Sequence, residues 1–423
     1  MSDTAKNGLS RYITAKDVKR SAIMAVWFMF LTFPIMVIKV NTVTDTVEWR
    51  WFNMLIIGVA SFILSHVWKL MIDRREGRMA DAVSSSVIVE KKTLRDRMEE
   101  KPMIKKVGSL VILVIAVLFP IVTGMYQTSI MITALLYVVL ALGLNIIVGL
   151  GGLLVLGYIV FYGVGAYTYA LLNYHFGLNF WLALPLGGIF AMIIGILIAI
   201  PVLRLRGDYL AIVTLAFGEI FRIVMENWNG LSFGPSGIAN IPRPTLFGLD
   251  FSIQQSTTLT YYVIVIFVII TIFIVRRLED SRLGRAWVAM REDEIAGEAM
   301  GIDMWKTKLA AFALSTFWAG VAGVIFAGKT TFINPASFTM WESILVLCMV
   351  VLGGMGSIPG VISGALIITL LPEYLRAFSE LRMLIFGAVL VLVMVFKPEG
   401  MIPAIRQKYE FKGITGNKNK GDK

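Results

Sequence analysis

The charged residues between two apolar runs offer the most chemistry in this sequence. Residues 276–308 are the longest charged segment in the second half of a very apolar chain. Their middle predicts a short helix, because Asp293 can cap its first turn, Glu294 suits the positive end of the helix dipole and Gly301 favours termination. These side chains can form hydrogen bonds and ion pairs with a partner, but they do not form a nucleophile–base pair.

Two interpretations fit this predicted helix. Ile295, Ala299 and Ile302 fall at i, i+4 and i+7 and give the helix one apolar face. The helix is either a solvated connector on the membrane surface or a docking helix for a soluble partner. The segment by itself leaves both open.

Other residue types that could build a site are scarce. Cys348 is the only cysteine, so no disulfide within the chain and no cysteine-based metal site can form. His66 and His175 are the only histidines and lie far apart in the sequence, which disfavours a histidine metal site and a Ser-His-Asp triad. We therefore expect no catalytic residue, no metal and no cofactor.

One segment matches a nucleotide-binding pattern by spacing alone. Residues 323–330 read GVIFAGKT, which fits the phosphate-loop pattern G-x-x-x-x-G-K-[ST]. That motif needs a preceding strand and a flexible loop whose backbone N–H groups wrap the phosphates. Here the intervening residues are apolar and end a membrane helix. We expect no ATP site in this chain and expect Lys329 at the outer membrane interface.

Composition indicates a membrane protein. Of the 423 residues, 57% are hydrophobic and 16% are charged, and the mean hydropathy is +0.77. The apolar runs are about 17–23 residues long and lack the alternation of barrel strands, so helices are the expected spanning elements. The net charge of +11 comes from basic residues in loops and tails, which indicates the positive-inside pattern rather than nucleic-acid binding. The expected partner is the lipid bilayer.

The order of the runs predicts an all-α polytopic membrane protein in three segments. Residues 1–106 hold two spans, at 22–38 and 51–72, joined by a short polar loop and followed by a basic cytoplasmic linker. Residues 107–402 form a core of about ten spans, and residues 403–423 form a basic cytoplasmic tail. Both termini are expected in the cytoplasm. The core spans are predicted at residues 107–123, 130–148, 153–172, 180–202, 209–225, 260–275, 309–328, 341–352, 358–371 and 383–396.

Glycine-rich breaks near residues 150 and 355 leave the span count open, because the segments beside them could be half-helices. The total is then ten or eleven instead of twelve. Residues 227–259 form the longest loop on the outer side, with Arg243 as their one basic residue. This loop is either a simple connection or a docking surface for an extracytoplasmic partner.

Polar residues inside the core runs are candidates for a translocation path. Glu219 and Arg222 are three residues apart and so lie on one helical face. Asn145 is the third candidate, near the end of its run. Intramembrane charges usually face a bundle interior or a wet path. Hydrogen bonds or an ion pair between helices would explain the same residues without a role in transport.

Five stretches together carry a family resemblance. They are GLGGLLVLGYIVFYGVGA at residues 149–166, LRLRGDYLAIVTLAFGE at 203–219, LGRAWVAMREDEIAGEAMGI at 283–302, VLGGMGS at 351–357 and KPEG at 397–400. In their order and number they resemble the LivM-type permease subunits of bacterial ABC importers for branched-chain amino acids. The resemblance covers residues 107–402.

This resemblance implies an ABC importer permease fold of the ten-span type in the bacterial inner membrane. Members of the family pair with a LivH-like sister permease. Two cytoplasmic ATPase subunits drive transport, and a periplasmic binding protein delivers leucine, isoleucine or valine. The predicted helix is then the coupling helix that seats in a groove of an ATPase subunit. The residues implied for this contact are Arg291, Glu292, Asp293, Glu294, Ala296, Gly297 and Gly301.

Two other functions stay open from the sequence. Similar permeases carry other small solutes, such as urea, short amides or sugars, and nothing in the candidate path residues excludes them. A self-sufficient secondary transporter would need ion-coupling carboxylates at the membrane midplane, for which Glu219 beside Arg222 is thin support.

Overall fold

The computed structural model of this chain describes residues 29, 38–41, 46–49, 58–59, 113–205, 207–245, 251–376, 382–397 and 400–403. The chain divides into two compact units, residues 1–106 and 107–423, and each is described by itself. Most of the two predicted N-terminal spans, the basic linker and the tail after residue 403 lie outside the described residues.

The first unit contains a β-hairpin where the sequence predicts a polar loop. Strand β1 (Ile38–Asn41) pairs antiparallel with β2 (Thr46–Trp49), and Val40 lies opposite Val47. Such β-branched pairs favour extended backbone, so the prediction of an all-α chain is wrong for this segment. Met29 and Gly58 are both helical and approach closely, because a Cβ on Gly58 would lie 2.7 Å from the Met29 sulfur.

The second unit is helical in its described residues, apart from connecting loops and one bridge between Ile238 and Ile333. A helical segment, Leu113–Val122, comes first. The elements that follow are α5 (Met125–Asn145), the π-helical turn η1 (Ile146–Leu150), α6 (Ile159–Phe176), α7 (Phe180–Val202), α8 (Asp208–Asn227), α9 (Asn229–Ser232), the 3₁₀ turn η2 (Gly234–Ser236), α10 (Ile253–Glu279), α11 (Arg282–Glu292), α12 (Glu294–Ala299), α13 (Met304–Thr330), the 3₁₀ turn η3 (Pro335–Ser337), α14 (Met340–Gly353), α15 (Ile358–Tyr374) and α16 (Arg382–Phe396).

The helical, multi-span prediction is confirmed for this unit. Five helices among the described residues are long and apolar enough to cross a membrane, and three further apolar helices are shorter. Helix α7 has the predicted bounds, and the Asn179 side chain caps it by accepting the Phe180 N–H at 2.8 Å. Helix α6 begins at Ile159 and not at residue 153, because residues 151–158 are irregular.

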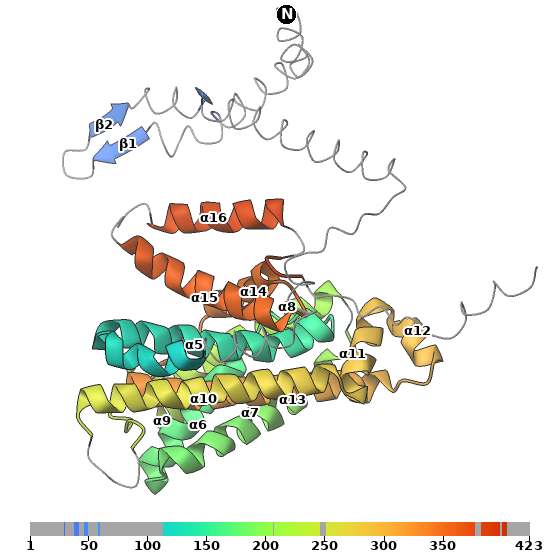
Figure 1. The fold of residues 1–423 in the computed structure, drawn as a ribbon, viewed down its shortest axis with the longest axis horizontal. Coiled ribbons are helices and arrows are strands. Elements are labelled where there is room, and N and C mark those ends of the chain that lie inside the picture. The colour runs from blue at the N-terminus through green and yellow to red at the C-terminus, as the bar shows by residue number, and fades with distance from the viewer. Residues whose placement is uncertain are drawn as a thin grey trace, which may run out of the picture. The chain divides into compact units, whose positions relative to one another are not determined.

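Helix α13 packs against α6 and α7 at backbone contact distance. A Cβ on Gly165 of α6 would lie 2.6 Å from the Gly320 Cα, and one on Gly323 would lie 2.8 Å from the Ala166 nitrogen. Small residues at such crossings let helices approach closely, which is a main source of helix association in lipid. Figure 1 shows α5, α10 and α13 running side by side, with α11 and α12 at one end of α10 and α13.

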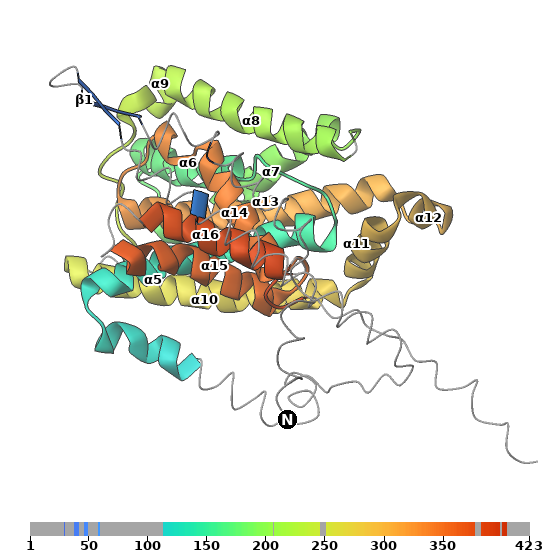
Figure 2. The ribbon, with the colours of Figure 1, turned by 90° about the horizontal axis from the view of Figure 1, so that it is seen from above.

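Helix α8 lies at the edge of this unit, along α6 and α7 (Figure 2). It buries only Leu210, Ala211, Thr214 and Gly218 within the chain. Large apolar side chains on its remaining surface, such as Ile212 and Ile220, are exposed. In a membrane protein such a surface contacts lipid or another apolar chain.

Valine at Gly165 is expected to separate α6 from α13. The new side chain would meet the Gly320 backbone, and overpacking of this kind destabilises by about 1–3 kcal/mol. We expect the Gly165→Val chain to unfold at a lower temperature, measured by fluorescence-detected size-exclusion chromatography after heating in detergent. Gly387→Val in α16 is the matched control, since no atom lies within 4 Å of a Cβ there. Equal midpoints for the two variants would contradict this packing.

Candidate functional site

Helices α11 and α12 form the segment that the sequence predicts to dock a partner. The Asp293 Oδ1 accepts the backbone N–H groups of Ile295 and Ala296 at 2.9 and 3.0 Å. The predicted start of the short helix at Asp293 is therefore confirmed. Helix α12 ends at Ala299, and Gly301 follows it with φ of +86°, a left-handed conformation that favours glycine.

Several contacts fix this segment to the start of α13. Trp287 of α11 is buried, and its indole N–H donates to the Thr307 carbonyl oxygen at 2.9 Å. The Lys308 ammonium, on a residue only 5% exposed, pairs with Glu294 at 2.6 Å. Gly297 is buried, and a Cβ there would meet the Met304 methyl group. Glu294 and Gly297 thus hold the segment in place within the chain.

The Asp303 side chain also lies at this junction of α12 and α13. It accepts the Lys306 backbone N–H at 3.1 Å, which caps α13, and pairs with the Lys306 ammonium at 2.9 Å. The hydrogen bond from the Lys306 side chain, with further backbone N–H groups, lowers the pKa of Asp303 from its ordinary value. Both helix starts are therefore capped by an aspartate side chain, Asp293 for α12 and Asp303 for α13.

The outer surface of α12 is apolar in part. Ile295 is 71% exposed and Met300 is 83% exposed. Ile302 instead packs inward against the core, so the predicted face of Ile295, Ala299 and Ile302 is wrong at Ile302. Met300 was missed because it follows the end of α12 and falls outside the helical period. The segment thus exposes two large apolar side chains, one in the first turn of α12 and one at its C-terminal end. Arg291, Glu292 and Ala296 are exposed as well.

Asn145 marks the point where α5 becomes the π-helical turn η1. It is buried, and its Oδ1 accepts the Gly356 N–H at 2.9 Å. Gly149 lies against the same amide, because a Cβ there would be 2.6 Å from the Gly356 nitrogen. Among the described residues the Asn145 Nδ2 has no hydrogen-bond partner. The oxygen of Asn145 therefore joins two segments far apart in the sequence.

Arg291 connects α11 to the same turn. Its Nη1 donates to the Gly149 carbonyl oxygen at 2.5 Å. Gly152 follows with φ of +69°, and a Cβ there would lie 2.7 Å from the Arg291 Cγ. We name Asn145, Gly149, Arg291 and Gly356 the motif junction.

The five stretches that carry the family resemblance meet at or beside this junction. Gly149 contacts residues 283–302 through Arg291 and residues 351–357 through Gly356, as described above. Residues 203–219 join because the Leu156 N–H donates to the Thr214 hydroxyl at 3.1 Å. Residues 397–400 join because a Cβ on Gly400 would lie 2.5 Å from the Gly354 nitrogen. The motifs therefore mark one place in the fold.

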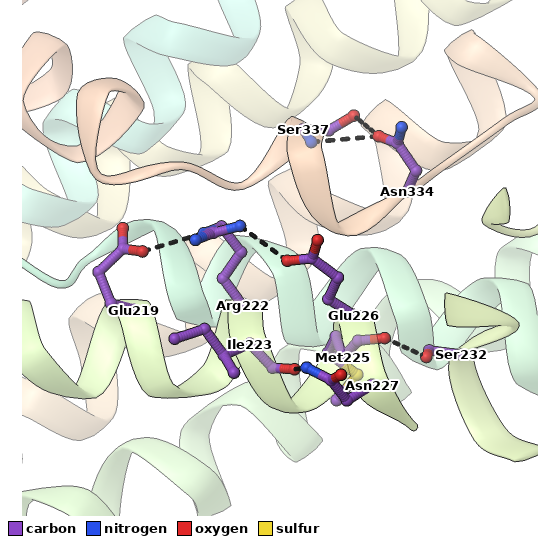
Figure 3. A network of polar contacts seen from close by, with 9 residues as sticks. All are labelled: Glu219, Arg222, Ile223, Met225, Glu226, Asn227, Ser232, Asn334 and Ser337. Carbon is purple, nitrogen blue, oxygen red and sulfur yellow. Dashed lines mark hydrogen bonds and ion pairs between the residues drawn. The ribbon is translucent and has the colours of Figure 1, made fainter. Parts of the chain in front are cut away.

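The other path candidates form a charged row on α8. Arg222 pairs with Glu219 and with Glu226, each at 2.9 Å (Figure 3). The predicted pairing of Glu219 with Arg222 is confirmed, but it is made within one helix and not between two. Glu226 was missed, although its spacing of four from Arg222 is the signal for such a pair. All three side chains are half-buried, and the turn η3 lies beside them.

The path candidates are not brought together. Among the described residues no hydrogen bond or ion pair joins Asn145 to Glu219 or Arg222, because Asn145 lies in the motif junction and the other two lie on α8. In the same part of the chain, no group of three or more His, Cys, Asp or Glu side chains could hold a metal ion.

Comparison with known proteins now identifies the class. A family model described as branched-chain amino acid transport system / permease component matches residues 126–394. The chain is 39% identical over 393 residues to the high-affinity branched-chain amino acid transport system permease protein LivM of Salmonella typhimurium strain LT2, covering 88% of this chain and 89% of that protein. It is 44% identical over 328 residues to LivM of Escherichia coli strain K12, covering 73% and 77%.

The permease protein LivH of the same Escherichia coli strain is 30% identical over 193 residues, covering 43% of this chain and 60% of LivH. No solved structure matches the chain. The protein is a multi-span membrane permease subunit. It belongs to the family of permease components of branched-chain amino acid transport systems, and the resemblance of the five motif stretches is confirmed.

Removing the Arg291 guanidinium should loosen the turn η1. Loss of a hydrogen bond from a charged donor destabilises by roughly 1.5–3 kcal/mol, so amide exchange in residues 146–152 should speed up by about tenfold or more in Arg291→Met. Hydrogen exchange with mass spectrometry on the full chain measures this. Arg285→Met is the matched control, because Arg285 lies on α11 and donates to the nearby Asp280 carbonyl. Unchanged exchange in Arg291→Met would show that the contact does not hold the turn.

Proposed function

We propose that this chain is one of two permease subunits of an ATP-driven importer for leucine, isoleucine and valine. Its family and its LivM relatives support the permease role and the substrate class. A LivH-like sister permease completes the channel, and two separate cytoplasmic ATPase subunits power it. A periplasmic binding protein delivers the amino acid. The chain lies in the bacterial inner membrane with both termini in the cytoplasm, as a ten-span core with two further N-terminal spans.

The observation that carries the proposal is the way α11 and α12 are built into the unit. They expose Ile295 and Met300, yet Trp287 and Lys308 fix them to α13. A simple connector needs neither rigid anchoring nor apolar side chains in water. A coupling element needs both. The partner must bind its exposed side chains, and its displacement must be transmitted to the membrane-spanning helices.

The displacement has a physical route into the membrane part. ATP binding brings the two ATPases together and moves the coupling helices that are seated in them. Movement of α12 shifts α13 directly and shifts the motif junction through Arg291 and Gly149. The junction contains a π-helical turn and glycine-rich breaks, which are points where helices change direction most easily. Rigid helices then rock about these points. This motion opens a central transport cavity first to one side of the membrane and then to the other.

The candidate path residues differ in whether they could contact a transported amino acid. The Glu219–Arg222–Glu226 row is half-buried and carries two carboxylates for one guanidinium, so it could meet the ammonium of an amino acid. Asn145 is buried and its oxygen is engaged, so its contribution is to hold the motif junction. Arg222 already neutralises the Glu219 carboxylate, which weakens the alternative of an ion-coupled secondary transporter.

Changes at the exposed surface of α12 test the docking role. Ile295→Glu and Ala296→Trp place a charge or a large ring where the ATPase groove would close, and we expect leucine uptake to fall by about tenfold or more. Membrane levels of the chain should stay normal, because neither side chain is buried within it. Ile295→Leu is the matched control and should transport normally. Normal uptake by both disruptive variants would refute the docking role.

A second test separates the helix cap from the charge at Asp293. Asp293→Arg removes the cap, which stabilises by about 0.5–2 kcal/mol, and should abolish uptake. Asp293→Asn keeps a capping oxygen and should retain most of the uptake in the same vesicle assay. Equal loss in the two variants would instead assign the effect to the negative charge. Gly297→Trp should also abolish uptake, through collision with Met304 inside the segment.

A further inference from the structure

A pocket of about 100 Å³ lies at the end of the second unit opposite α11 and α12. Its walls come from the starts of α5 and α10, the end of α13 and the loop that carries Arg243. The volume is several times the roughly 30 Å³ share of one liquid water molecule, so a small group of atoms fits inside. We propose that this pocket binds one oxyanionic group, of the carboxylate or phosphate class.

Lys329 supplies the first reason. It belongs to the GKT segment, which is helical within α13 and has no place in the coupling role. Its ammonium donates to the Ser129 carbonyl oxygen at 3.0 Å and to the Thr133 hydroxyl. An ammonium group has three N–H donors, so one is left for a ligand in the pocket.

Ser256 supplies the second reason. It is only 3% exposed, it lines the pocket, and its hydroxyl has no hydrogen-bond partner among the described residues. The neighbouring Thr257 and Thr260 hydroxyls donate to the carbonyl oxygens of Ile253 and Ser256, each at 2.8 Å. Ser256 is thus the hydroxyl of this wall that can still donate, and buried hydroxyl groups are normally paired.

The charges of the walls define the class of ligand. Arg243 and Lys329 are the charged residues of the lining, which contains no acid. Neither of them forms an ion pair with another described residue. Two cations and a free hydroxyl converge on one small space, which is the donor set that a carboxylate or phosphate oxygen prefers.

The rest of such a ligand must lie outside the pocket, because the space holds only its anionic end. The group can come from an amino acid at the extracytoplasmic mouth of the permease or from the phosphate of a lipid in the outer leaflet. Trp181 lies at this end and donates to the Thr245 carbonyl oxygen at 2.8 Å, as expected for a residue at the headgroup level. The proposal uses no part of the coupling mechanism.

The test is ligand-induced stabilisation of the full-length chain in a neutral detergent. The free-anion probes are sodium acetate and sodium phosphate, compared with sodium chloride at equal ionic strength. The lipid probe is phosphatidylglycerol, compared with a diacylglycerol that has the same chains and no phosphate. We expect a saturable rise of the thermal midpoint with at least one of these oxyanionic probes. A response to acetate or phosphate identifies a free anion, and a response to phosphatidylglycerol alone identifies a lipid.

The variants decide whether the binding occurs in this pocket. Lys329→Met and Arg243→Gln should each raise the apparent Kd of the active probe by about tenfold or more, and Ser256→Ala should raise it by about threefold. Lys306→Met, at the opposite end of α13, should leave it unchanged. If Lys329→Met does not fold, Arg243→Gln and Ser256→Ala still decide, because neither side chain has a hydrogen-bond partner to lose among the described residues. The proposal is overturned if no oxyanionic probe stabilises the wild type, or if the variants bind as the wild type does.

Discussion

The glycine-mediated contact of α13 with α6 and α7 is the constraint on which the rest of this structure depends. No side chain separates the helices at Gly165, Gly320 and Gly323, so their backbones fix one another directly. Both ends of α13 then carry residues of interest in fixed positions. Lys308 at its start holds α12, and Lys329 at its end reaches the pocket. A rigid helix thus joins the two ends of the unit.

The motif junction explains why five separate stretches resemble one family. Three stretches contribute glycines to places where backbones nearly touch, and the other two contribute the polar side chains of Thr214 and Arg291. Gly149 approaches Gly356, Gly400 approaches Gly354, and Arg291 reaches the carbonyl oxygen of Gly149. A larger residue at any of these glycines would force segments apart. The family pattern therefore reflects close packing of the backbone at these glycines. The same packing places α11 against the turn η1.

Local signals predicted much of this fold, and contacts between distant segments account for what was missed. The cap at Asp293 and the bounds of α7 follow from neighbouring residues. The late start of α6 does not, because residues 151–158 are held open by Arg291 and Thr214. Glu294 pairs with Lys308, and Gly297 packs against Met304. Both partners lie on the next helix, so neighbouring residues do not predict these contacts. The pocket was missed because its residues come from three helices and a loop.

The central claim is that this chain is a permease subunit that binds separate ATPase subunits. Affinity purification of the tagged chain in mild detergent, with mass spectrometry of the recovered proteins, tests this most directly. The claim predicts stoichiometric recovery of one sister permease and two ATPase polypeptides. Recovery of this chain alone, still monodisperse, would contradict the claim and remove the coupling role from α11 and α12.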